Sequence, residues 1–461
     1  MSLLASPSVS APRSWLKLLT LGGLSQAEQT LYWLALLSPL WWLLGLQVLL
    51  YPAVLIGLLV MAFDLDKLLK GSLPACAWAW LAMAAVMLWT GGLGLLDVGF
   101  GFKAVAAQAV TFFKSYCLIF ACIALPFWTR LRVQVITRAV AWMATGYLVV
   151  IAIEMVMLVL GIGEQGYTPF LAKLIPGDKQ SMQVLFANMS LFFGIMLPRT
   201  GLYTPDSPIL GVAAVCCVLI CQGEAQPQLR KLALAGSLLA LILSFSRSAW
   251  ISLPLALLIS AAFGSSLARQ VSLWGASLFS LLCAVFGLTP SQLIEAPLTI
   301  FTQARPDSSG DRELVVRKTL EAWQESPWLG WGIIRGAVRW HTYEVALGSF
   351  STYASVLYLH GIVGFAVFLA TLVVTLLDFW KPSRQGNPLA RQAFGSLVAL
   401  YLMCAATPLS WMAIYLWFYF VWLGAVLAET RQEPFSVRSW QELMAGGVPS
   451  SRHQQWSGGQ W

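Results

Sequence analysis

Residues 231–264 have the sequence KLALAGSLLALILSFSRSAWISLPLALLISAAFG, two apolar segments joined by a turn that holds one arginine, Arg247. Each segment is about as long as a helix must be to cross the hydrocarbon core of a bilayer. Because the turn has almost no length, Arg247 is expected at a membrane boundary. The hydroxyls around it belong to Ser244, Ser246 and Ser248. The stretch therefore predicts a helical hairpin in a membrane with a basic side chain at its tip.

The whole chain has the composition of a polytopic membrane protein. Of its 461 residues, 58% are hydrophobic and 10% are charged, and the mean hydropathy is +0.74. Several apolar stretches are too long for a soluble core, so we expect an all-α bundle of about twelve transmembrane helices. They are predicted near residues 31–45, 47–63, 76–96, 105–127, 135–160, 208–222, 231–245, 248–264, 271–288, 352–377, 393–409 and 411–428.

Basic residues orient this bundle, because short cytoplasmic loops carry an excess of lysine and arginine. With twelve spans, both termini are predicted in the cytoplasm, as an N-terminal tail (1–30) and a partly disordered C-terminal tail (429–461). The net charge of +8 then orients helices rather than recruiting nucleic acid. The basic residues that fall on the cytoplasmic side are Lys67, Lys70, Arg130, Arg132, Arg230, Lys231, Arg269, Lys381, Arg384 and Arg391.

The opposite side receives a large loop, residues 289–351, in which short helices are expected. Segment 183–198 is apolar but too short to span comfortably, so we interpret it as re-entrant or interfacial on this outer face. No metal site is expected, because the eight cysteines lie in apolar segments without metal-ligand spacing to histidine.

Arg312 is the most informative residue of the large loop. Ser308, Ser309 or Asp311 is expected to cap a helix that runs to about Gln324. Arg312 would then lie in the first turn, where a cation opposes the helix dipole. Anion binding by Arg312 would explain a cation at this position, and we therefore predict that Arg312 binds an anion. Further along, ALGSFSTYASVLYLHGIVGF (346–365) places Ser349 and Ser351 in a polar cap on the next span.

At this point three motifs together resemble a known family. They are SFSRSAW, the pattern formed by Arg312, Trp323, Pro327, Gly330 and Gly332, and the S-x-S/T…LY…G-I-V-G pattern at 349–364. In order and spacing they are similar to the O-antigen ligases and polymerases, bacterial membrane proteins, in a form familiar from cyanobacteria. PRTGLYTPDSP (198–208) resembles a further landmark of that family.

The resemblance implies a GT-C-like domain over 31–428 in the bacterial inner membrane that performs a metal-independent, inverting glycosyl transfer at the periplasmic face. The donor would be a polyprenyl-diphosphate-linked glycan, and the acceptor a hydroxyl on a glycan, lipid or protein. No cofactor is implied, the remaining partners are membrane lipids, and the oligomeric state is open. Arg247 and Arg312 would hold the donor diphosphate and stabilise the departing charge.

One position departs from the family pattern. Where the ligases have a histidine proposed to activate the acceptor, this chain has Phe350, which cannot accept a proton. His341 and Glu344 are the candidate replacements. Either the chain catalyses glycosyl transfer with its arginines and without a histidine, as some polymerases are thought to do, or it has lost the glycosyl transfer activity. The second alternative would leave a lipid-glycan binding protein or a transporter, such as the proposed inorganic-carbon transporters among its relatives.

Charged residues near the membrane complete the candidate site. Lys114 and Glu154 lie within predicted spans, where ionisable side chains either serve a function or pair with each other. Arg199, in the PRTG segment, is expected on the outer face. We therefore place Lys114 and Arg199, together with Ser246, Ser349 and Ser351, among the residues that bind substrate.

Overall fold

The computed structural model describes residues 23–69, 73–174, 182–287, 306–340 and 343–432, and most of them are helical. The helices are α2 (Gln26–Leu36), α3 (Ser38–Leu44), α4 (Gln47–Ala62), α5 (Leu65–Leu69), α6 (Ala75–Val98), α7 (Phe102–Lys114), α8 (Tyr116–Trp128), α9 (Val133–Val159), η1 (Leu171–Leu174), α10 (Ser207–Cys221), α11 (Pro227–Leu243), α12 (Arg247–Gly264), α13 (Ser266–Val285), α15 (Pro306–Gln324), α16 (Thr352–Arg384), α17 (Pro388–Met403), α18 (Leu409–Met412), η3 (Ala413–Leu416) and α19 (Trp417–Gln432). This confirms the all-α class.

Each of the twelve predicted spans overlaps one or more of these helices. By length and composition, seven described helical segments can cross a membrane, and α4 and α10 are shorter apolar helices. The chain is therefore a polytopic membrane protein, while the number twelve remains a prediction. The seven segments are Ala75–Val98, Phe102–Trp128, Val133–Val159, Arg247–Gly264, Ser266–Val285, Thr352–Arg384 and Leu409–Arg431.

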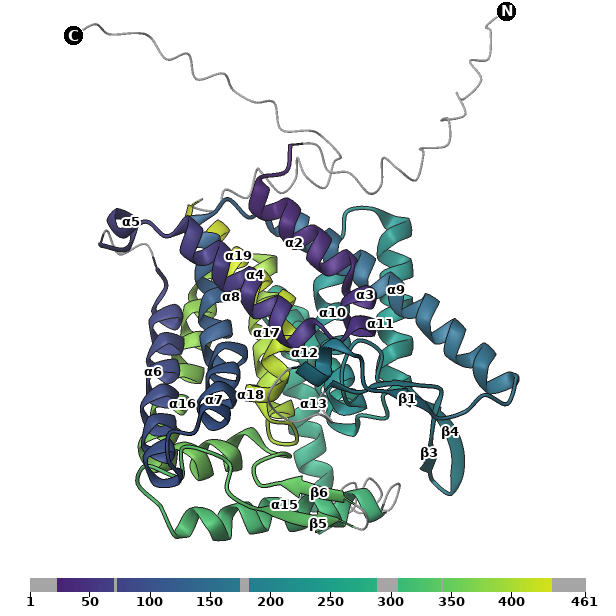
Figure 1. The fold of residues 1–461 in the computed structure, drawn as a ribbon. Coiled ribbons are helices and arrows are strands. Elements are labelled where there is room, and N and C mark those ends of the chain that lie inside the picture. Colours follow the sequence, from purple (N-terminus) through teal and green to yellow (C-terminus); the bar gives the residue numbers. More distant parts are fainter. Residues whose placement is uncertain (1–22, 70–72, 175–181, 288–305, 341–342, 433–461) are drawn as a thin grey trace, which may run out of the picture.

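The two described ends of the chain lie at the same end of the molecule. Figure 1 shows the start of α2 and the end of α19 there, and α15 with its neighbouring strands at the opposite end. The predicted N-terminal tail (1–30) is too long, because α2 begins after Ser25. That residue forms a capping box with Glu28, a start signal that the sequence prediction overlooked. The C-terminal tail also starts later than residue 429, since α19 continues to Gln432.

The interior of the bundle is built around α10, all of whose residues are buried, and around α19. A helix that is apolar on every side is stable only when other helices surround it. Among the described residues, a buried ion pair ties α9 to the end of α10, with the Arg138 guanidinium 2.7 Å from the Glu224 carboxylate.

Strands occur only in two-stranded antiparallel sheets in the described part of the chain. The segment 183–198 was predicted to be re-entrant or interfacial. Its second half forms a pair of antiparallel strands in which Phe192 lies opposite Ile195. The turn residues Phe193 and Gly194 both have positive φ, which is the geometry of a two-residue turn between antiparallel strands. The strands are β1 (Gln165–Tyr167), β2 (Val184–Phe186), β3 (Asn188–Phe192), β4 (Ile195–Arg199), β5 (Ala337–Trp340) and β6 (Tyr343–Ala346).

The described part of the large loop contains one helix of 19 residues, α15, and the β5–β6 hairpin. The prediction that α15 ends at Gln324 is confirmed, but the helix begins at Pro306, a residue favoured in the first helical turn. Arg312 therefore lies in the second turn, and the helix-dipole argument for its role is wrong.

Helix α16 is broken at Gly361, whose φ of 63° and ψ of −167° are accessible only to glycine. The loop 327–332 (PWLGWG) packs into this break. Ile362 N–H donates to the Pro327 carbonyl at 2.9 Å, and Gly332 N–H donates to the Leu359 carbonyl at 2.8 Å. The loop thus satisfies backbone groups that a helix break would otherwise leave bare inside a membrane.

This packing explains the glycines of the sequence motif. A Cβ on Gly330 would collide with the backbone of His360, and a Cβ on Gly332 would collide with the carbonyl of Thr90 on α6. Both glycines have positive φ. Because the loop follows α15 directly, it fixes α15 against α6 and α16.

Candidate functional site

A tight turn joins α11 to α12 and presents Arg247. Phe245 has a φ of 49°, and Ser246 N–H donates to the Ser244 hydroxyl oxygen at 3.2 Å. Gly211 of α10 packs against this turn, where any Cβ would collide with the Ser246 side chain. The turn is therefore rigid, and Arg247 stands half-buried at the start of α12.

The Arg312 guanidinium reaches the same region from α15. Its Nη1 donates to the Ala406 carbonyl at 3.5 Å, and its Cζ lies 4.9 Å from the centre of the Phe350 ring. Arg247 and Arg312 are close enough for the charge of one to act on the other. Two half-buried like charges repel, so their proximity favours an anion between them.

Arg199 belongs to this cluster as well. Its Nε donates to the Ser244 carbonyl at 3.4 Å, and the next residue, Thr200, donates its N–H to the Leu243 carbonyl at 3.2 Å. The end of β4 is thus attached to the turn that carries Arg247. The structure brings Arg199, Ser246 and Arg247 together, and their contact with substrate remains a prediction.

Lys114 lies beside α18, which directly follows the 404–408 segment that Arg312 contacts. The helix predicted over 105–127 is interrupted at Ser115, so Lys114 is the last residue of α7 and not a mid-helix residue. Its Nζ lies 5.9 Å from the centre of the Trp411 ring, and the Ser115 hydroxyl donates to the Ser410 carbonyl at 2.8 Å.

Residues 232–369 match the family model of the O-antigen ligases. This match covers less than half of the chain, and over these residues it supports the resemblance to the O-antigen ligase family. The matched residues include Arg247, Arg312 and Phe350, while Lys114 and Arg199 lie outside them. No curated protein matches the chain. O-antigen ligases transfer glycans from a lipid-linked donor to an acceptor, and glycosyl transfer of this general kind is the activity that the match implies.

The two predicted substrate-binding serines near α16 both form hydrogen bonds with backbone groups. The Ser351 hydroxyl caps α16 by accepting the Ala354 N–H at 3.4 Å, and the Ser349 hydroxyl donates to the Ala346 carbonyl at 2.5 Å. Their contact with substrate remains a prediction. Thr352, which the sequence analysis did not select, donates its hydroxyl to the Thr407 carbonyl at 2.6 Å and holds the 404–408 connection in place.

The candidate bases have different surroundings. His341 lies outside the described residues. Glu344 is exposed on β6, opposite Arg339 in the hairpin register. Asp311, expected only as a helix cap, is half-buried beside Arg312, and one of its carboxylate oxygens is buried without a hydrogen-bond partner.

Two further charged residues acquire roles that the sequence did not suggest. Arg335 donates to Asp97 at 2.7 Å and lies 4.7 Å over the Trp331 ring, so it fastens the loop after α15 to α6. Glu154 does not pair with Lys114, contrary to one of the two interpretations of these charges. Its carboxylate instead interacts with the Thr200 side chain and the Ala187 backbone, at the base of the β3–β4 hairpin.

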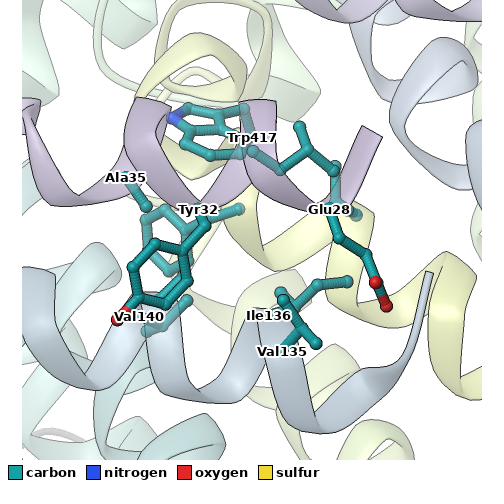
Figure 2. A pocket seen from close by; sticks show the side chains of 11 residues that line it. Glu28, Tyr32, Ala35, Val135, Ile136, Val140 and Trp417 are labelled. Atoms are coloured by element: carbon teal, nitrogen blue, oxygen red, sulfur yellow. The ribbon is translucent and has the colours of Figure 1, made fainter. Parts of the chain in front are cut away.

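Figure 2 shows a small crevice between α2, α9 and α19. Its lining is apolar except for Glu28, and that carboxylate accepts from Arg132 Nε at 2.8 Å. None of the clustered arginines lines this crevice, and its one charged group is already paired with Arg132.

Proposed function

We propose that the chain transfers a glycan from a polyprenyl-diphosphate carrier to an acceptor hydroxyl at the periplasmic face of the bacterial inner membrane. The observation that carries this proposal is the proximity of Arg247 and Arg312, which come from separate segments of the chain. Guanidinium groups bind phosphate oxygens in a bidentate manner, and two of them match the two phosphates of the carrier. Arg199 supplies a third positive charge beside the same turn.

The mechanism is an inverting, metal-independent displacement. The acceptor oxygen attacks the anomeric carbon, the bond from that carbon to the diphosphate breaks, and the diphosphate leaves with the electron pair. Negative charge on the leaving group increases in the transition state, where Arg247 and Arg312 stabilise it. A general base takes the proton from the acceptor hydroxyl.

We assign the base to Asp311, because its buried carboxylate oxygen without a partner lies next to Arg312 along α15. Asp311→Asn is expected to lower kcat by about 100-fold or more, the usual contribution of a general base. Glu344→Gln is expected to remain near wild type, since Glu344 is exposed on the hairpin. The measurement is glycan transfer in proteoliposomes. A loss confined to Glu344→Gln or to His341→Ala would assign the base to that residue instead.

Phe350 provides a test of whether the chain is a working enzyme. Its ring lies against the Arg312 guanidinium, and an imidazole at the same position would stay neutral beside that cation and able to accept a proton. We expect reconstituted wild-type protein to transfer a lipid-linked oligosaccharide, and Phe350→His to be at least as active.

Inactive wild-type protein together with active Phe350→His would overturn this proposal. It would show that the chain binds lipid-linked glycan without transferring it, the alternative left open by the missing histidine. The same protein assayed for bicarbonate uptake tests the transporter alternative. Uptake by proteoliposomes that show no glycan transfer would favour that function.

A further inference from the structure

The β3–β4 hairpin ends in a cluster of exposed apolar side chains. The exposed fractions are 52% for Leu191, 59% for Phe193, 61% for Ile195 and 53% for Met196. In Figure 1 the hairpin projects from the bundle on the same flank as the C-terminal end of α9. Large apolar side chains gathered on a projecting element mark a surface that something other than water covers.

The base of this hairpin is fixed and polar. Arg199 pairs with Asn188 in the register, and the flanking residues Ala187 and Thr200 both interact with the buried Glu154 of α9. Each strand has five residues, so the turn lies roughly 15 Å from the base at about 3.4 Å per residue. The hairpin is therefore polar at its charged base and apolar at its tip.

An aromatic contact links the hairpin to the arginine turn. The Phe192 ring stacks on the Phe245 ring at 4.8 Å between centroids, and the Trp250 ring lies 5.8 Å from Phe192. Phe245 is the positive-φ residue of the turn that precedes Arg247. A displacement of the hairpin would consequently displace this turn.

The surface of α9 indicates what covers the tip. This helix can span a membrane, and its exposed side chains on the half next to the hairpin are apolar, including Val149, Ile153 and Val156. Such a face is covered by lipid chains in a bilayer. Glu154 of the same helix interacts with Thr200 and Ala187 at the hairpin base, so the hairpin starts beside this apolar surface of α9.

We propose that the tip of the β3–β4 hairpin inserts into the acyl chains of the outer leaflet. Insertion sets the depth of Arg199 and of the turn that carries Arg247. Both then lie at the level of lipid phosphates, where a carrier diphosphate would also lie. This last step rests on the proposed function, whereas the insertion itself does not.

The insertion is tested by spin labels on Phe193→Cys and Ile195→Cys, in full-length protein in nanodiscs of phosphatidylethanolamine and phosphatidylglycerol. The unsubstituted protein gives the background from its own cysteines. We expect the labels to relax more with oxygen than with a water-soluble nickel chelate. A label on Arg317→Cys, exposed on α15, is expected to show the reverse. Tip labels as accessible to nickel as this control would overturn the proposal.

A second experiment separates the effect of the hairpin tip on donor binding from any effect on glycosyl transfer. Phe193→Asp combined with Ile195→Asp is expected to raise KM for the lipid-linked donor about tenfold with little change in kcat, because it perturbs donor binding and not the transition state. The matched Phe193→Leu, Ile195→Leu variant keeps the apolar tip and should resemble wild type. Unchanged KM in the aspartate variant would contradict the coupling to the arginines. Arg247→Ala should leave the membrane depth of the labels unchanged. The label experiment therefore tests insertion separately from the proposed function.

Discussion

Replacing Arg247 or Arg312 with alanine is expected to lower kcat/KM for glycan transfer about 100- to 1,000-fold, the usual effect of removing a group that stabilises departing charge. The two guanidinium groups are close enough for their charges to interact, and neither alanine can bind a phosphate oxygen. The measurement is transfer from a polyprenyl-diphosphate oligosaccharide by purified variants in proteoliposomes. Lysine at either position should restore part of the rate, because it keeps the charge but loses bidentate geometry.

Arg317→Ala is the control for that experiment, because Arg317 is on the same helix as Arg312 and is exposed. It should transfer at the wild-type rate. Equal losses in all three alanine variants would indicate a nonspecific effect of positive charge, and wild-type rates in Arg247→Ala and Arg312→Ala would remove the proposed mechanism.

Gly361→Ala is expected to have the largest effect on stability, a loss of about 3 kcal/mol or more. Its backbone conformation is closed to residues with a side chain, and the added Cβ would collide with the carbonyl of Trp328. The variant should unfold at lower temperature in detergent, as followed by size-exclusion chromatography after heating. It should also lose transfer, because the loop that fills the break directly follows α15.

A matched pair on α6 tests the same packing from the other side. Gly94→Ala would push a Cβ against the carbonyl of Trp331, while a Cβ on Gly92 would meet nothing within 4 Å. We therefore expect Gly94→Ala to be destabilised and Gly92→Ala to match or exceed wild type, since alanine favours helix. Equal thermal stability of these two variants would mean that the loop does not hold α6.

The sequence was sufficient to predict the helices and to place Arg247 and Arg312 in the same region. Apolar length alone identifies a membrane helix, so all twelve predicted segments fall on helices. The meeting of the two arginines followed from motif order and from a topology that put both on one face. Arg199 was predicted on the same grounds, and the structure attaches it to the turn before Arg247.

The sequence was not sufficient where the fold depends on backbone contacts between distant segments. The break in α16 requires the 327–332 loop to supply hydrogen bonds, which no local pattern around Gly361 reveals. The β3–β4 hairpin was missed because its turn residues, Phe193 and Gly194, are not the usual asparagine–glycine pair. The role of Glu154 depends on that hairpin, and so it could not be foreseen either.

The central claim is that Arg247 and Arg312 hold one diphosphate together, and a double-mutant cycle on kcat/KM tests it most directly. Two side chains that act on the same group are coupled, so the double alanine variant should be far more active than the product of the single effects implies. Measured in proteoliposomes, a double variant about as active as either single variant is the result we predict. Losses that simply multiply would mean that the two arginines act on separate groups.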